Sequence, residues 1–290
     1  MTKRPSKPRP ILLMIYGDAH PNSLVGLCPP VVVRDNGSEH HYSDAQRWLW
    51  DNWIATWETV KEWKKALKAE LWLVINGDGT DDNKHSHHGL ITVNKSVIID
   101  LSIDVHQIAA RIADKVFYVR GTEAHAGGAG ELEEQVAQEL GCVPDDETGN
   151  RSWWHLPLVA NSVTFDIAHH PPSNSTRPWT KGGGAERTAA IMVYEYGQDG
   201  LLPPDVTIRS HVHHFEDSGT DRTTRCFFTP PWQLCTAFGH RVGFSGRIEP
   251  VGVLGFVCRG EPHTYEFRKL IYKPERRKPW HSPTKSPKAN

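Results

Sequence analysis

Cysteine is scarce in this chain and offers no pairing pattern. Five cysteines are spread over 290 residues without a Cys-x-x-Cys pair, which argues against a disulfide framework and against a zinc ribbon. No apolar run approaches the length that spans a bilayer. The N-terminal segment is charged and interrupted by proline, unlike a secretory signal. We therefore expect a reduced, soluble protein of the cytoplasm without a membrane partner.

The formal net charge is only −1, but it is unevenly distributed. Residues 1–10 carry four Lys or Arg and no acid, and residues 273–290 carry six Lys or Arg and one Glu. The chain between them keeps 23 basic and 33 acidic residues, a net charge of about −10. Both ends are rich in proline, lysine and serine, which bury too little apolar surface to fold. We predict flexible tails over 1–10 and 273–290 around one catalytic domain of residues 11–272.

Acidic and histidine residues recur where a short apolar run ends. The runs cover residues 11–16, 71–75, 116–119, 163–168 and 206–208, and they lead into Asp18 and His20, Asp78, Glu123 and His125, His169 and His170, and His211 and His213. Short β-rich apolar runs are typical of buried strands. Because ligands of open sheets collect at the carboxyl ends of strands, the pattern predicts one site built from five strand ends.

Helical patterns separate these runs. Ser43-x-x-Gln46 is a capping box, and a tryptophan-rich stripe at helical spacing follows it. We expect this stripe to pack in the core rather than to stack on bases; it comprises Trp48, Trp50, Trp53, Trp57 and Trp63. Further helices are predicted over 97–113, 131–140 and within 182–197, and strands over 225–228, 251–257 and 264–271. The order of elements favours an α/β protein with layered sheets covered by helices.

Carboxylates and imidazoles in this arrangement suit a pair of metal ions. A dinuclear site needs two ligand sets and a shared carboxylate, with the ions about 3.5–4 Å apart. Mixed oxygen and nitrogen ligands favour Mn, Fe, Zn, Ni or Co over Mg or Ca. Asp18 and His20 flank a single residue and can reach the same ion. His211 and His213 share that spacing, although two ions could divide them, and Asp78 is the natural bridge.

The order of these motifs resembles the calcineurin-like metallophosphoesterase family. It runs Asp-x-His, Gly-Asp, a Gly-led turn with a His, a lone His after a strand, and His-x-His. The variants Gly-Thr-Glu-Ala-His, His-His-Pro-Pro and Thr-Pro-Pro-Trp-Gln-Leu resemble a phage and prophage branch. The likeness covers nearly the whole chain between the tails. It implies a four-layer α/β/β/α sandwich with two central mixed β-sheets.

The resemblance also implies a role for each site residue. Asp18, His20 and His213 would bind the first ion, Asp78 would bridge, and His169 and His211 would bind the second. The family's third motif, Gly-Asn-His-Asp/Glu, is replaced here by Gly121-Thr122-Glu123-Ala124-His125. We assign Glu123 the ligand role, with Thr122 as the alternative, and His125 the role next to the leaving group. His87, His88 and His170 are further candidates for substrate binding, and Lys181 with glycines 182–184 is a weaker one.

These assignments predict hydrolysis of a phosphoester, with a phosphodiester as the first expectation and a nucleotide as one possible source. A hydroxide bridging two divalent transition-metal ions would attack phosphorus in line, with Asp78 and His125 as catalytic residues. A metal-dependent nuclease is the main alternative, because the basic tails could hold nucleic acid, but the acidic body lacks a basic face. A phage accessory protein that binds metal with little turnover is a second alternative, against which the intact His125 argues. A zinc peptidase lacks its His-Glu-x-x-His motif. The oligomeric state stays open.

Overall fold

The computed structural model describes residues 8–82, 89–172, 180, 183–220, 223–243 and 248–276. Most of the two predicted tails therefore lies outside the described residues, as do His87, His88, Lys181 and Gly182. The division into one domain with flanking tails stays a prediction. No described helix is both long and apolar enough to cross a membrane.

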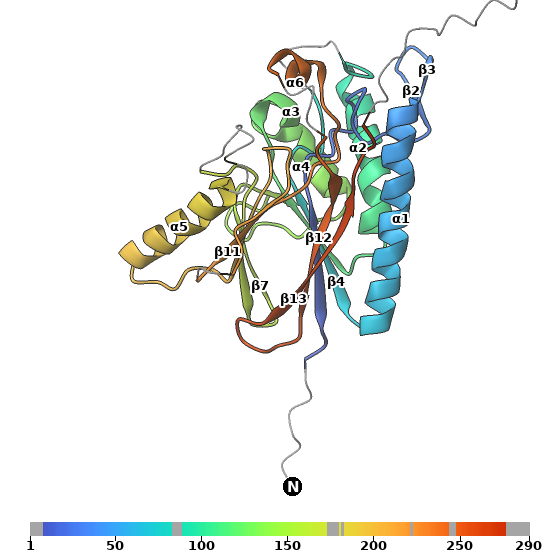
Figure 1. The fold of residues 1–290 in the computed structure, drawn as a ribbon. Helices are drawn as coiled ribbons and strands as arrows, with labels where there is room; N and C mark the ends of the chain where they lie inside the picture. The colour runs from blue at the N-terminus through green and yellow to red at the C-terminus, as the bar shows by residue number, and fades with distance from the viewer. Residues whose placement is uncertain are drawn as a thin grey trace, which may run out of the picture.

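Two mixed β-sheets form the centre of the molecule (Figure 1). The first has the order β13-β12-β1-β4-β5-β6. Its strands β1 (Ile11–Tyr16), β4 (Glu70–Asn76), β5 (Lys115–Val119) and β6 (Ser152–Trp153) are parallel. β12 (Val251–Cys258) pairs antiparallel with β1, and β13 (Tyr265–Tyr272) pairs antiparallel with β12. The second has the order β10-β11-β9-β8-β7, with β7 (Leu156–Ala160), β8 (Val163–Ile167), β9 (Val206–Arg209), β10 (Glu216–Asp217) and β11 (Arg225–Phe228). A small ribbon of β2 (Val31–Val33) and β3 (Glu39–His41) lies apart from both.

Helices cover the outer face of each sheet. α1 (Asp44–Leu67), α2 (Lys95–Ala110) and α4 (Glu131–Glu139) pack on the first sheet, and α5 (Gly183–Gln198) packs on the second, at the opposite side of the molecule (Figure 1). The short helices α3 (Glu123–Ala126) and α6 (Ala237–Arg241) lie at one end of the strands. This arrangement confirms the predicted α/β/β/α sandwich with two central mixed sheets.

The apolar runs of the sequence are buried on both faces because each central strand separates two cores. Along β1, Leu12 and Met14 face the core beneath the helices, whereas Leu13 and Ile15 face the core between the sheets. Alternate residues of a strand point to opposite faces. A strand covered on both sides must therefore be apolar throughout, which explains why the sequence shows continuous runs rather than alternation.

The tryptophan-rich helix is α1, and its stripe packs on the core as predicted: Trp53 and Trp57 are buried, and the other three tryptophans are partly buried against it. The capping box of Ser43 and Gln46 is formed at its N-terminus. The Trp53 side chain is fully buried and meets the rings of Tyr16, Trp57 and Trp232 edge-on, with centroids 4.9–5.2 Å apart. This packing fixes the helix against β1, whose C-terminal end leads into the predicted site.

Candidate metal centre

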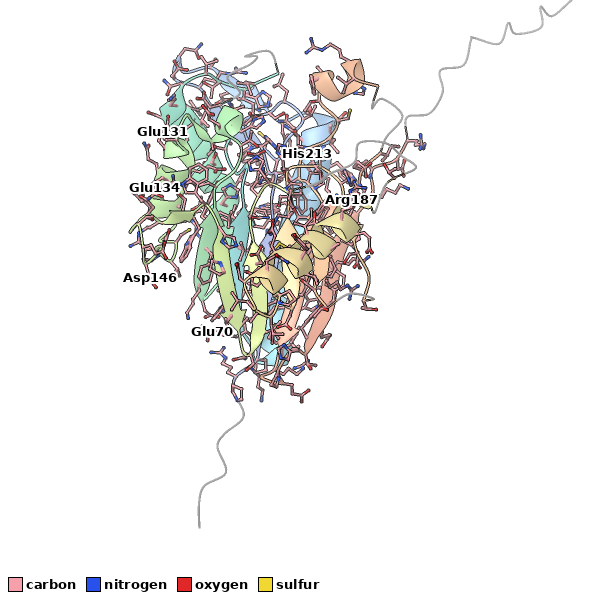
Figure 2. All side chains as sticks on the ribbon, turned by 90° about the vertical axis from the view of Figure 1, so that its left-hand side faces the viewer. Glu70, Glu131, Glu134, Asp146, Arg187 and His213 are labelled. Atoms are coloured by element: carbon pink, nitrogen blue, oxygen red, sulfur yellow. The ribbon has the colours of Figure 1, made fainter. Side chains whose placement is uncertain are left out.

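The polar clusters meet because the strands that precede them are parallel and end at one edge. In the first sheet, β1 leads to Asp18 and His20, β4 to Asp78, and β5 to Thr122; in the second, β8 leads to His169 and β9 to His211. Figure 2 shows His213 and Glu70, the first residue of β4, at opposite ends of the strands. The site therefore lies at the carboxyl ends of the strands, the end expected for ligands in such sheets.

One group of candidate ligands joins Asp18, His20, Asp78 and His213, whose donor atoms all lie within 4.8 Å of one another. Nε2 of His213 is 3.2 Å from Nε2 of His20 and 3.3 Å from Oδ1 of Asp18. Two nitrogens held by one tetrahedral zinc ion, at about 2.0–2.1 Å each, would be about 3.3 Å apart. This spacing fits a shared ion.

A second group joins His169, His170 and His211. Asp78 connects it to the first group, because its Oδ2 lies 3.2 Å from Nε2 of His169 and 3.7 Å from Nε2 of His20. The structure thus puts Asp78 between two sets of donors, where a bridging ligand would have to be.

A third group joins His20 and His125 to Asp81, a residue that the sequence pattern did not single out. The Asp81 side chain is buried, although a run of polar residues follows it in the sequence. Its Oδ1 lies 2.7 Å from Nδ1 of His125, and its Oδ2 lies 3.6 Å from Nδ1 of His20. Its position only three residues beyond Asp78 could have marked it as a site residue. The polar residues that follow it make the segment resemble an ordinary surface loop.

The altered third motif brings Thr122, rather than Glu123, among the other donors. The Thr122 hydroxyl is 3.3 Å from Oδ2 of Asp78 and 3.1 Å from Nδ1 of His211. Glu123 begins α3, its side chain is exposed, and it belongs to none of the three groups among the described residues. Of the two residues, Thr122 is therefore the one that lies beside the other donors, and the expected position of Glu123 among them is wrong.

Five of the predicted ligands have left-handed backbone conformations that only glycine adopts without strain. The φ angles are 53° for Asp18, 41° for His20, 50° for Asp78, 70° for His211 and 53° for His213. Such conformations cost of order 1–3 kcal/mol each and cluster at functional sites. Here they turn the chain sharply at the end of each strand, so that consecutive ligands converge instead of continuing away from the sheet.

The charges of the site favour cations. Burial opposes the ionisation of Asp18 and Asp78, but the facing histidines, His213 for Asp18 and His169 for both carboxyls, outweigh it and lower both pKa values. Burial and the neighbouring His169 lower the pKa of His211 to about 4, so this imidazole is neutral at physiological pH. Burial lowers the pKa of His169, but the charges of Asp78 and Asp18 and the hydrogen bond with Asp78 outweigh it and raise this pKa to about 10, so a bound cation would have to displace that proton. Buried carboxylates together with imidazoles form a donor set that fits divalent transition-metal ions.

Comparison with known proteins gives likenesses of fold only. No family model and no curated protein matches the sequence. Among solved structures, Vps29 of Chaetomium thermophilum is 11% identical, covers 91% of this chain and 98% of its own, and has a TM-score of 0.40. A dimetal phosphatase of Danio rerio is 7% identical, covers 90% and 99%, and has a TM-score of 0.42. A hypothetical protein of Pyrococcus horikoshii is 11% identical, covers 90% and 88%, and also has a TM-score of 0.42. At these values the likeness carries no conclusion about activity, and the family and its phage branch stay predictions.

Glu133 of α4 fixes the two turns that carry Asp78 and Thr122. Its buried carboxylate accepts hydrogen bonds from the backbone N–H of Gly79 at 2.9 Å and of Gly121 at 2.6 Å. Burial raises its pKa to about 7, with the charge of Asp78 acting in the same direction and the two N–H groups opposing it. The sequence pattern gave this residue no role beyond its helix, because nothing local relates it to either glycine.

Replacement of this carboxylate by an amide should weaken metal binding. Glu133→Gln keeps the shape but offers one acceptor, so one glycine N–H must face an NH₂ group. We expect metal affinity to fall by about 10–100-fold, the usual effect of removing a group that orients a ligand. Competition with a chelating dye measures this, and Glu139→Gln, an exposed change on the same helix, is the matched control. Equal metal affinities in Glu133→Gln and Glu139→Gln would mean that Glu133 does not support metal binding.

Proposed function

We propose that the protein is a phosphoesterase that works with two divalent transition-metal ions. The observation that carries this proposal is the sharing of Asp78 between two converging sets of oxygen and nitrogen donors. A shared carboxylate between two sets is the requirement of a dinuclear centre. A single structural ion would need only one of the sets.

The residues divide naturally between the two ions. Asp18, His20, Asp78 and His213 would hold the first, and Asp78, His169 and His211 the second, with the Thr122 hydroxyl close to the position that we first assigned to Glu123. When bound, such ions activate water and neutralise charge on phosphoryl oxygens. Asp18 and Asp78 contribute two negative charges to this donor set, fewer than two divalent ions supply, so the loaded site would still attract an anionic substrate within an acidic protein.

His125 is suited to protonate the leaving oxygen. Its Nδ1 is 2.7 Å from Oδ1 of Asp81, which leaves Nε2 to act on a substrate. Burial lowers the pKa of His125, but the hydrogen bond with Asp81 and the charges of Asp78, Asp81 and Asp18 outweigh it and raise the pKa to about 9. The imidazole is therefore protonated at neutral pH, as a proton donor must be.

The substrate that we propose is a phosphodiester, such as a nucleotide derivative, hydrolysed in the cytoplasm. The reaction chemistry also suits monoesters and nucleic acids, and the metal pair can be drawn from Mn, Fe, Zn, Ni and Co. A panel of aryl diester, aryl monoester, cyclic nucleotide and DNA substrates tests the choice. Fastest turnover of DNA, with strong inhibition by salt, would replace the phosphodiesterase proposal with the nuclease alternative.

Loss of the shared carboxylate should disrupt both metal sites. We expect elemental analysis to find two transition-metal ions per chain in the wild-type protein. In Asp78→Ala, the occupancy of both metal sites should fall. His213→Ala, which removes a donor from one set only, should spare the other ion and lose less activity. Two bound ions with near-normal turnover in Asp78→Ala would contradict the bridging role.

Removal of the proposed proton donor should slow catalysis without loss of metal. His125→Ala should lower kcat by roughly 10²–10⁴, the scale of general-acid catalysis. The loss should be smaller for a p-nitrophenyl leaving group, which needs little protonation, than for an alkoxide. His41→Ala, at an exposed histidine far along the chain, is the control. Loss of bound metal in His125→Ala would instead indicate that His125 is a metal ligand. An unchanged kcat would mean that another residue protonates the leaving oxygen.

Asp81, the hydrogen-bond partner of His125, should set the pH above which activity falls. Asp81→Asn keeps the size of the side chain but removes the negative charge that raises the pKa of His125. A donor with a lower pKa loses its proton at lower pH, so the alkaline limb of the kcat profile should move to lower pH while metal content is retained. If the alkaline limb of the kcat profile stays at the same pH in Asp81→Asn, Asp81 does not control the pKa of the proton donor.

A further inference from the structure

The two halves of the centre differ in ligand chemistry. The first set contains two carboxylates and two imidazoles, whereas the second contains three imidazoles, His169, His170 and His211, beside the shared Asp78. Carboxylate oxygen suits manganese, and imidazole nitrogen suits zinc, iron, nickel and copper. The second half therefore has the softer set of donors.

Four of these donors converge on one small volume. The Thr122 Oγ1 atom lies 3.1 Å from Nδ1 of His211, 3.3 Å from Nε2 of His170, 3.4 Å from Nε2 of His169 and 3.3 Å from Oδ2 of Asp78. The four donor atoms are therefore gathered around the Thr122 hydroxyl, close enough together for one ion beside this hydroxyl to reach them after a small movement. Three nitrogens and one oxygen around a point make up a common zinc ligand set.

The local backbone explains how two consecutive histidines serve the same point. His169 and His170 lie in a bend just beyond the end of β8, so their side chains do not alternate as they would in a strand. Nδ1 of His169 lies 2.8 Å from the backbone carbonyl of Asn76, which turns Nε2 of this ring toward the centre. The His170 ring lies 4.8 Å from that of His169 and 4.6 Å from that of His211, measured between centroids.

We propose that His170 is a direct ligand of the second ion and makes this half of the centre selective for zinc over manganese. The inference rests on the proposed function only in assuming a second ion. The donor atoms of this group lie within 4.8 Å of one another, whereas two nitrogens on one tetrahedral zinc ion are about 3.3 Å apart. Binding of an ion would therefore draw the donors together, and His170 is the member of the group whose ring is exposed and has room to move inward. Thr122 then becomes a neutral neighbour of the ion.

Titration of the metal-free full-length chain with zinc and with manganese tests the proposal. His170→Ala should weaken one of the two zinc sites by more than about 100-fold, because the loss of a ligand costs more than the roughly 10–100-fold that follows the loss of an orienting group. Manganese binding should change less. His170→Asp supplies a replacement oxygen and should regain binding with a preference shifted toward manganese. His41→Ala controls for the loss of an exposed histidine.

Thr122→Val tests whether Thr122 or His170 is the ligand of the second ion. If Thr122 is a neighbour, this variant should keep zinc affinity within about threefold, and the visible spectrum of the cobalt-loaded protein should change in His170→Ala but not in Thr122→Val. Loss of zinc in Thr122→Val with normal binding in His170→Ala would overturn the proposal. So would identical zinc affinities in wild type and His170→Ala.

The same measurements separate this inference from the proposed function. A wild-type chain that binds two zinc ions and loses one in His170→Ala supports the inference, even if no phosphoester is hydrolysed. A chain that hydrolyses phosphoesters with two ions, and keeps both affinities in His170→Ala, overturns the inference and leaves the proposed function intact. A chain that binds fewer than two ions overturns both.

Discussion

The burial of two carboxylates side by side is the constraint on which the site depends. Asp18 and Asp78 are almost inaccessible to solvent, and a buried charge is costly unless it is paired and hydrogen-bonded. The backbone N–H of His211 donates to Asp18, and the backbone N–H of Thr122 donates to Asp78 at 2.6 Å. Each carboxylate therefore binds the backbone of a loop that follows another strand. These hydrogen bonds hold the loops, and the donor side chains on them, close to the two carboxylates.

The central sheets make this arrangement possible. Parallel strands β1, β4 and β5 end at one edge, and β8 and β9 of the second sheet bring their loops to the same place. Tight contact between these loops then requires a small residue at Gly77, where a Cβ atom would lie 2.2 Å from Nδ1 of His169. Backbone strain at the ligands is tolerated because the apolar cores on both faces of the first sheet hold the strand ends in place.

The inner side of the centre is buried and hydrogen-bonded, whereas its outer side is exposed. Behind Asp78, buried Glu133 and His106 hold the peptide groups of Gly79 by hydrogen bonds. At the rim, His125 is partly exposed and His170 is exposed. Under the proposed function, metal ligation would need the buried, hydrogen-bonded side, and admission of a substrate would need the exposed side. The division follows from the fold, because the helices close the inner side and the strand ends open toward solvent.

Much of this protein was determined by local sequence. Each acidic or histidine cluster directly follows its strand, so the convergence of Asp78 with the other clusters could be predicted without knowledge of the fold. The strand 225–228 also occurs as predicted. β7 was not predicted because Pro157 interrupts its apolar run, a residue tolerated there because β7 is an edge strand. Only the tertiary structure shows that Thr122, and not Glu123, lies beside the other donors, since the direction of the turn after β5 depends on what packs around it. The same holds for Asp81 and Glu133, because hydrogen bonds between distant segments leave no periodic trace in the sequence.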